Sequence, residues 1–317
     1  MSKARKVLEA TESSEDKLRK RIRELEKQLK TVTEQAHADR VSSFKLSIGK
    51  KRNTKGGKHC RVIIPDSHGS LIDKGAATAF LHDLDIVKPS EIVMLGDHLE
   101  CGGFLAQHHT LGYVAQSKYT FSDDTTAANQ FLDEIQKRSN CQIHYIEGNH
   151  EQRIEKWIVD ATVKSPHDGE MFRKMFSVDS VLHLEKRGIR WIRQGETYDR
   201  LKIPTTIKLG KCFFTHGIST AKHAAHAHVQ KFGGNIVFGH THRVDSYMIK
   251  TVNEGAIGGW SPGCLCELQP LWRHTNPTDW SHGYGLQMVE SNGRFLHINV
   301  PIIDGKSLLS PLIDELK

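Results

Sequence analysis

The sequence predicts a layered α/β fold preceded by an N-terminal helix, and three observations support this prediction. From residue 61 onward, short apolar runs alternate with amphipathic helical patterns, which is typical of βαβ units. The second half of the chain is richer in strand patterns than the first, as a β-sandwich requires. Before residue 40, apolar residues recur in steps of four and three, as they do along one side of a helix.

Length and composition exclude several classes of protein. A chain of 317 residues is long enough for one large α/β domain or two small ones with a sizeable core. The six cysteines are scattered without a CxxC pair, so a small disulfide-stapled fold is excluded. Met1 leads into charged residues, and no apolar stretch of 18 residues follows. We therefore expect a cytoplasmic protein with reduced thiols and no membrane contact.

The N-terminal segment, residues 1–39, is predicted to be a helix that forms a coiled coil. Its apolar positions are Leu18, Ile22, Leu25, Leu29, Val32 and Ala36. They fit about three heptads, so we expect a homo-oligomer of modest pairing strength. The alternative is a single amphipathic helix that packs on the main domain.

A basic linker, residues 40–60, is expected after this helix. Residues 1–61 hold 18 basic and 8 acidic side chains, whereas residues 62–317 are slightly acidic. The positive charge therefore belongs to the N-terminal fifth of the chain. Either it contacts a nucleic-acid backbone or it is a solvated linker, and both readings stay open.

Residues 61–317 are predicted to form the catalytic domain. The apolar runs RVIIP, EIVML and IHYIE predict strands, with helices over about 74–87, 124–139 and 150–161. The runs KCFFT and NIVFG predict two further strands around a helix near 220–232. Strand patterns near 246–250, 255–260, 285–290 and 295–300 complete the domain.

Polar residues with metal-binding side chains follow five of these strands. They are Asp66 and His68, Asp97, Asn149 and His150, His216, and His240 and His242. Ligands bind at the carboxyl ends of strands in open α/β sheets, so these ends should bring the eight side chains together, seven of them as potential metal ligands. Two divalent ions about 3.5–4 Å apart can clamp a phosphate during an in-line displacement. Mixed oxygen and nitrogen ligands without thiolate favour Mn, Fe, Zn or Mg. We expect two divalent ions, and Mn is the metal that we expect most.

The motifs DSHG (66–69), GDHLE (96–100), GNHE (148–151), THG (215–217) and GHTH (239–242) resemble those of the calcineurin-like metallophosphoesterase superfamily, in the same order. The resemblance implies a four-layer double β-sandwich flanked by helices. It places Asp66, His68, Asp97 and His242 on one metal ion. It places Asp97, Asn149, His216 and His240 on the other, so that Asp97 bridges. Residues 61–300 further resemble metallophosphoesterases carried by bacteriophages, which would place the protein in the host cytoplasm.

The resemblance also implies catalytic roles beyond metal binding. His150 would be the general acid that protonates the leaving oxygen. The family usually has Asp or His where Glu100 stands, and Glu100 is expected to orient His150. His98, within the same motif, is either a supporting group or an exposed side chain.

Other residues near these motifs have open interpretations. Arg153, Arg243 and His223 are candidates for substrate binding, although ion pairing or packing on a helix would also explain them. Cys264 and Cys266 are flanked by Trp260, Trp272 and Trp280. These tryptophans either stack on nucleic-acid bases or complete a hydrophobic core.

Together these observations predict metal-dependent phosphoester hydrolysis, most simply of a phosphodiester in nucleic acid. The alternative is a phosphomonoesterase acting on phosphoprotein or a small ester, with the N-terminal helix used for oligomerisation. A non-catalytic scaffold is a third reading, which the complete ligand set and His150 argue against.

Overall fold

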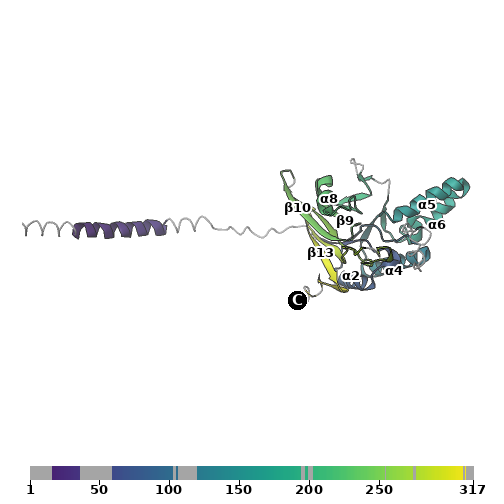
Figure 1. The fold of residues 1–317 in the computed structure, drawn as a ribbon, viewed down its shortest axis with the longest axis horizontal. Helices are drawn as coiled ribbons and strands as arrows, with labels where there is room; N and C mark the ends of the chain where they lie inside the picture. Colours follow the sequence, from purple (N-terminus) through teal and green to yellow (C-terminus); the bar gives the residue numbers. More distant parts are fainter. Residues whose placement is uncertain are drawn as a thin grey trace, which may run out of the picture. The chain divides into compact units, whose positions relative to one another are not determined.

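The computed structural model describes residues 16–35, 59–102, 105, 120–193, 197–198, 203–253, 255–273, 276–309 and 311. The chain divides into two compact units, Met1–Thr54 and Lys55–Lys317. In the first unit, residues 16–35 form one helix (Figure 1). Five apolar side chains of the predicted seam are 49–68% exposed on it: Leu18, Ile22, Leu25, Leu29 and Val32. Ala36 and most of the predicted basic linker, residues 40–58, lie outside the described residues.

The second unit contains a seven-stranded sheet among its described residues. Its order is β14-β13-β12-β1-β2-β3-β4. The strands are β1 (His59–Ile64), β2 (Glu91–Met94), β3 (Gln142–Ile146), β4 (Arg190–Ile192), β12 (Gly283–Val289), β13 (Phe295–Ile303) and β14 (Lys306–Ser307). Strands β1 to β4 are parallel, and β12 adds to β1 in the antiparallel direction.

A second sheet has the order β10-β11-β9-β8-β7 within the described chain. Its strands are β7 (Thr206–Leu209), β8 (Cys212–Thr215), β9 (Asn235–Phe238), β10 (Val244–Thr251) and β11 (Gly255–Pro262). Strands β8 and β9 are parallel, as the two βα patterns predict, whereas β10 and β11 form an antiparallel pair. A short ribbon pairs β5 (Thr197–Tyr198) with β6 (Ile203–Pro204).

Some of the α-helices of this unit lie on the outer faces of the two sheets, and others extend beyond them at one side (Figure 1). They are α2 (Lys74–Val87), α4 (Phe121–Arg138), α5 (Glu151–Lys164), α6 (Gly169–Phe176), α7 (Val178–Leu182) and α8 (Ala224–Phe232). Helix α4 begins with a capping box between Thr120 and Asp123, which satisfies backbone amides of its first turn. Helix α8 begins four residues later than predicted. Helices α6 and α7 and strands β4 and β7 were not predicted.

Burial alternates along the central strands and defines four layers. On β1, Val62 and Ile64 belong to the large cluster that includes helix residues such as Phe80 of α2. Ile63, between them, belongs to a second cluster with residues of the other sheet, including Phe214 of β8. A third cluster joins that second sheet to α8 through Val229. The order helix, sheet, sheet, helix confirms the predicted double β-sandwich.

In the part of the chain that the structure describes, no helix combines the length and the apolar composition that crossing a membrane requires.

Candidate metal centre

The predicted ligands all follow parallel strands of the two sheets. Asp66 and His68 come after β1, Asp97 after β2, Asn149 after β3, His216 after β8, and His240 and His242 after β9. Parallel strands that run side by side end at one edge, so these side chains meet there. All of them are buried except Asn149 and His240, which are partly exposed. The five sequence motifs are therefore neighbours in space.

The first group of ligand atoms comprises Asp66, His68 and His242. The Nε2 atom of His242 lies 3.0 Å from Oδ2 of Asp66 and 3.1 Å from Nε2 of His68. The Asp66 carboxylate also accepts the backbone N–H of His240, at 3.0 and 3.1 Å from its two oxygens. This contact ties the loop after β9 to the loop after β1.

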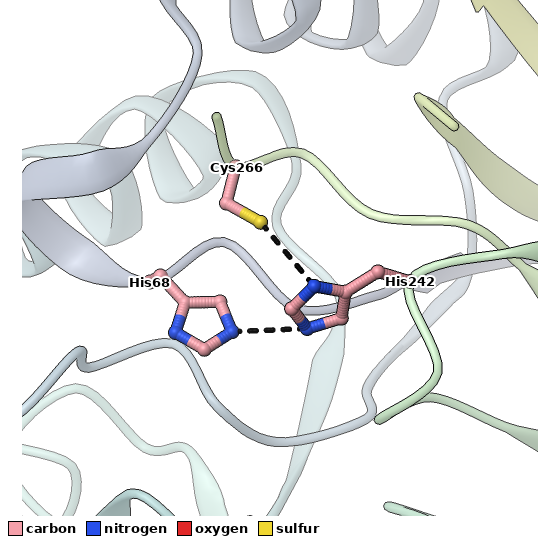
Figure 2. A group of neighbouring side chains, drawn as sticks. All are labelled: His68, His242 and Cys266. Atoms are coloured by element: carbon pink, nitrogen blue, oxygen red, sulfur yellow. Dashed lines mark hydrogen bonds between the residues drawn. The ribbon is translucent and has the colours of Figure 1, made fainter. Parts of the chain in front are cut away.

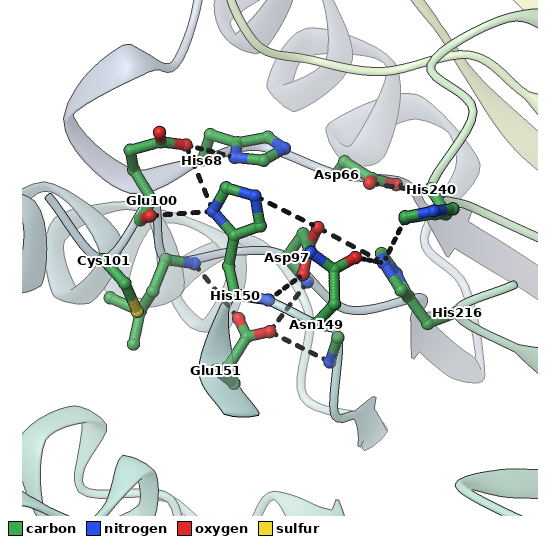
Figure 3. Close-up of polar contacts among 12 residues, drawn as sticks. Asp66, His68, Asp97, Glu100, Cys101, Asn149, His150, Glu151, His216 and His240 are labelled. Carbon is green, nitrogen blue, oxygen red and sulfur yellow. Dashed lines mark hydrogen bonds and ion pairs between the residues drawn. The ribbon is translucent and has the colours of Figure 1, made fainter. Parts of the chain in front are cut away.

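The second group is centred on Nε2 of His216. This atom lies 2.9 Å from Oδ1 of Asn149, 3.1 Å from Nδ1 of His240 and 3.2 Å from Oδ2 of Asp97 (Figure 3). The carboxylate oxygens of Asp97 also lie close to atoms of His68 and His150. Asp97 therefore lies between the two groups, close to His68 of the first and His216 of the second, where a bridging ligand would lie.

Hydrogen bonds at the Nδ1 atoms orient the imidazole rings. Nδ1 of His68 donates to Oε2 of Glu100 (2.6 Å), and Nδ1 of His216 donates to the carbonyl of Leu95 (3.0 Å). In His242, Nδ1 lies 3.8 Å from Sγ of Cys266 (Figure 2). With Nδ1 engaged in this way, each ring turns Nε2 toward the other candidate ligands, which is how metal-binding histidines are held in proteins.

These ligand atoms fit divalent cations. The Nε2 atoms of His68 and His242 face one another at 3.1 Å, so a proton or a cation must lie beside them. The spacings of 2.9–3.2 Å within each group are compatible with ligands about 2.1 Å from one ion. The donors are oxygens and imidazole nitrogens, which suit Mn, Fe, Zn or Mg.

The backbone at the site is strained. Nine described non-glycine residues have positive φ, and four of them are candidate ligands: His68, Asp97, His240 and His242. Each such residue costs about 1–3 kcal/mol and persists only where its surroundings impose it. Strain concentrated on these four side chains is typical of a functional site.

Glu100, His150 and Arg153 form a connected group beside the first set of ligands. Nδ1 of His150 donates to the backbone carbonyl of Glu100 at 2.7 Å and lies 3.3 Å from its carboxylate. The Arg153 guanidinium donates to Nε2 of His150 (2.8 Å) and to the same carbonyl (3.1 Å). Glu100 therefore contacts His150, as expected, and it also holds His68.

Two buried carboxylates that the sequence analysis did not select support the ligand loops. Glu151 accepts the backbone amides of Asp97, His98, Leu99 and Gly148 and the hydroxyl of Tyr145, at 2.8–3.1 Å. Asp124 of α4 accepts the amides of Ser70, Glu100 and Cys101. Figure 3 shows Glu151 beneath Asp97 and His150. Together these two carboxylates fix the path of the chain after β1 and β2.

His98 takes a supporting position within its motif. It is buried, and its Nδ1 atom lies 2.8 Å from the hydroxyl of Ser67. Its ring packs edge-on against Tyr145 at 5.1 Å between centroids. Burial lowers the pKa of His98 to about 3, so the ring is neutral.

The electrostatics of the site attract positive charge. Burial opposes a charge on His68, but the hydrogen bond to Glu100 and the charges of Glu100, Asp97 and Asp66 together raise the pKa of His68 to about 10. Burial also opposes protonation of His216, yet the charge of Asp97 raises the pKa of His216 to about 9. Despite burial, the same histidine charges hold the pKa of Asp97 well below its usual range. The field that draws protons onto these rings also favours divalent cations.

Arg243, His223 and Trp260 make their contacts away from the ligand groups. The Arg243 guanidinium pairs with Asp279 (3.1 Å) and with the carbonyls of Thr220 and Ala221. His223 is exposed and directly precedes α8. Trp260 packs against Phe295 in the cluster between the sheets. Of the three candidate phosphate-binding residues, the structure brings only Arg153 next to a predicted catalytic group.

Cys266, Trp272 and Trp280 lie beside the first group of ligands. The Trp280 ring meets the His242 ring edge-on, with 4.1 Å between centroids. A pocket between them is lined by these residues, His68 and Pro270, among others. Cys266 is far from His242 in sequence, and no pattern around it indicated this position.

Comparisons with known proteins give remote structural likenesses. No family model matches the sequence, and no curated protein matches it. Vacuolar Protein Sorting 29 from Cryptosporidium parvum is 13% identical with a TM-score of 0.40, covering 79% of this chain and 94% of that one. Wild-type Vps29 complexed with Zn²⁺ from Entamoeba histolytica is 13% identical with a TM-score of 0.39, covering 78% and 95%. Yfce, a phosphoesterase from E. coli, is 16% identical with a TM-score of 0.33, covering 76% and 98%. Scores this low assign the chain to none of these proteins' families.

Proposed function

We propose that this chain is a metal-dependent phosphoester hydrolase with a dinuclear centre, and that its substrate is a phosphodiester in nucleic acid. The observation that carries the proposal is the pair of ligand groups that share Asp97. Each group gathers oxygen and imidazole ligands from different strand ends at spacings of 2.9–3.2 Å. A structural role alone would not require the Nε2 atoms of two buried histidines to face one another.

Asp66, His68, Asp97 and His242 would hold the first ion. Asp97, Asn149, His216 and His240 would hold the second. Two divalent cations in such a site lower the pKa of water and neutralise the charge of a phosphate. The protein contributes the bridging charge of Asp97, the neutral Asn149, and the hydrogen bonds that keep each ring in place.

His150 is proposed to protonate the leaving oxygen. Its Nδ1–H is fixed on the carbonyl of Glu100, so Nε2 is the atom available for proton transfer. In the structure, Arg153 donates to that Nε2 atom. A substrate phosphate offers Arg153 a stronger, charged acceptor. Movement of the guanidinium onto the phosphate then frees Nε2 of His150 to carry the proton.

A nucleic-acid substrate is supported by the charge at the N-terminus. Among residues 16–35, seven side chains are basic and four are acidic, and all are exposed. Basic residues bind nucleic acid by displacing counterions from phosphates. The exposed apolar seam on the same helix supports a homo-oligomer, which would multiply these contacts.

The experiment is a hydrolysis panel with Mn²⁺ on labelled single- and double-stranded DNA, RNA, bis-p-nitrophenyl phosphate, p-nitrophenyl phosphate and a phosphopeptide. Faster hydrolysis of diesters than of monoesters, abolished by a chelator and restored by Mn²⁺, is the expected result. Preference for monoesters would favour the phosphomonoesterase alternative. No hydrolysis by protein shown to hold two ions would contradict the proposal.

The role of the basic residues has its own test. Lys50, Lys51, Arg52 and Lys55 are changed together to Gln, which leaves the apolar seam intact. We expect weaker DNA binding and a shallower salt dependence, because each lost phosphate contact removes about 0.9 from the slope of log K against log salt. An unchanged slope would reject this segment as a nucleic-acid contact.

A further inference from the structure

We propose that the pocket beside His242 is a subsite for a nucleobase that belongs to the nucleoside joined to the scissile phosphate. This inference rests on the proposed function and names the substrate group that the site selects. The subsite is formed by Pro270, Trp272 and Trp280, with Arg273 above the two indole rings, and it adjoins His68 and His242.

The aromatic side chains of the pocket are in contact with the metal centre. The Trp280 ring lies against the His242 ring, with centroids 4.1 Å apart. Trp272 packs edge-on against Trp280 at 5.8 Å. Both indoles are only partly buried, so ring surface remains for a ligand. A group bound there lies next to the metal centre, where the phosphate is proposed to bind. A nucleoside attached to that phosphate must lie in such a position.

Polar groups suited to a base lie at the pocket and beside it. The Arg273 guanidinium lies 5.0 Å from the ring centre of Trp272 and 5.9 Å from that of Trp280. It supplies a cationic plane and hydrogen-bond donors. Glu267 also lines the pocket, and a carboxylate can accept an N–H from the edge of a base, thymine included. A planar ring with donors and acceptors on its edge satisfies these groups, whereas an alkyl or sugar group alone cannot stack.

The segment that carries the tryptophans is anchored to the ligand loops. The backbone amide of Leu265 donates to the carbonyl of Asp66, and that of Ser281 donates to the carbonyl of His242, at 2.8 and 2.9 Å. Within the segment, the Gln269 amide bonds the carbonyls of Arg273 (2.7 Å) and Asn276 (3.1 Å). The tryptophans are therefore held in place before a ligand arrives, which reduces the entropy lost on binding.

The test compares two diesters with the same leaving group, thymidine 5′-(p-nitrophenyl phosphate) and methyl p-nitrophenyl phosphate. Base stacking on an aromatic side chain predicts a kcat/KM about 5- to 150-fold higher for the thymidine ester. In Trp272→Ala this ratio should fall toward one, and Trp272→Phe should restore part of it. Leu271→Ala, an exposed neighbour on the same turn, is the matched control and should keep the wild-type ratio.

A binding measurement separates this inference from the proposed function. Thymidine 5′-monophosphate should quench the tryptophan fluorescence of the full chain, methyl phosphate should not, and Trp272→Ala should lose most of the quenching. If neither diester is hydrolysed but this quenching is seen, the hydrolase proposal fails and the subsite stands. Equal kcat/KM values for both esters in the wild type, together with no quenching by the nucleotide, would overturn the subsite.

Discussion

Replacing Glu151 by Gln should destabilise the fold and empty the metal site. The carboxylate is fully buried and accepts five hydrogen bonds, two at Oε2 from Asp97 and Gly148 and three at Oε1 from His98, Leu99 and Tyr145. A Gln side chain in its best orientation keeps the three bonds at one oxygen. Its amide N–H₂ then faces the two backbone N–H groups that lost their acceptor.

The cost follows from that arrangement. A buried donor without a partner costs about 1–3 kcal/mol, so two of them predict a loss of about 2–6 kcal/mol in the free energy of unfolding. One of the two donors is the amide of Asp97, so the proposed bridging ligand itself should shift. Burial and the charge of Asp97 raise the pKa of Glu151. Because all five partners donate, the ionised form still fits the site best.

Urea unfolding followed by circular dichroism measures the stability, and elemental analysis measures the bound metal. Asp160→Asn is the matched control, because it makes the same change of carboxylate to amide at an exposed position of α5. It should stay within about 0.5 kcal/mol of the wild type. A Glu151→Gln protein of wild-type stability with two bound ions would refute the assigned role.

Three further predictions concern catalysis and pH. His150→Ala should keep both ions and lower kcat for DNA about 10²–10⁴-fold, but it should lower kcat less for a nitrophenyl ester, whose leaving group needs no proton. Equal losses for both substrates would show that His150 has another role. Metal affinity should rise with pH through neutrality, because the raised pKa values of His68 and His216 require both rings to release protons when ions bind. Calorimetry in buffers of different ionisation enthalpy counts the released protons, and a count of zero would contradict the assignment of these rings as ligands. Burial opposes ionisation of Glu91, but hydrogen bonds from His144 and Arg61 lower its pKa from 4.5 to about 2, so the ionised carboxylate stabilises the fold above pH 4.5 by up to about 3 kcal/mol. The difference in unfolding free energy between the wild type and Glu91→Gln should shrink as pH falls from 4.5 toward 2, and a difference that stays constant would refute this role of Glu91.

Much of the site was predictable because residues that follow parallel strands lie at the same edge of a sheet. Apolar runs of four or five residues mark buried parallel strands, and whatever follows them lies at one edge of a sheet. Asp66, Asp97 and His216 each occupy that position. The helix predicted over about 74–87 is confirmed as α2, which begins after an N-cap at Asp73.

The supporting residues were less predictable because they depend on side-chain direction or on distant segments. Glu151 stands within a recognisable motif, but its role depends on the path of the loop after β2. Asp124 reaches the site from helix α4, and Cys266 reaches it from a segment that forms an isolated β-bridge with Ile72. The sequence patterns of these segments do not indicate that either side chain lies at the site. Arg243 directly follows a ligand, yet its side chain turns toward Asp279. Adjacency in sequence fixes where a backbone lies and leaves the side chain's partner undetermined.

Metal content measured together with turnover decides whether the chain holds two ions bridged by Asp97. The wild type is expected to bind two equivalents of Mn²⁺ and to hydrolyse bis-p-nitrophenyl phosphate only when they are present. In Asp97→Asn the charge shared by the two ions is lost, and their mutual repulsion is no longer offset. That variant should retain one ion or none and have no measurable turnover. Two ions retained in Asp97→Asn with near-normal turnover would contradict the dinuclear assignment.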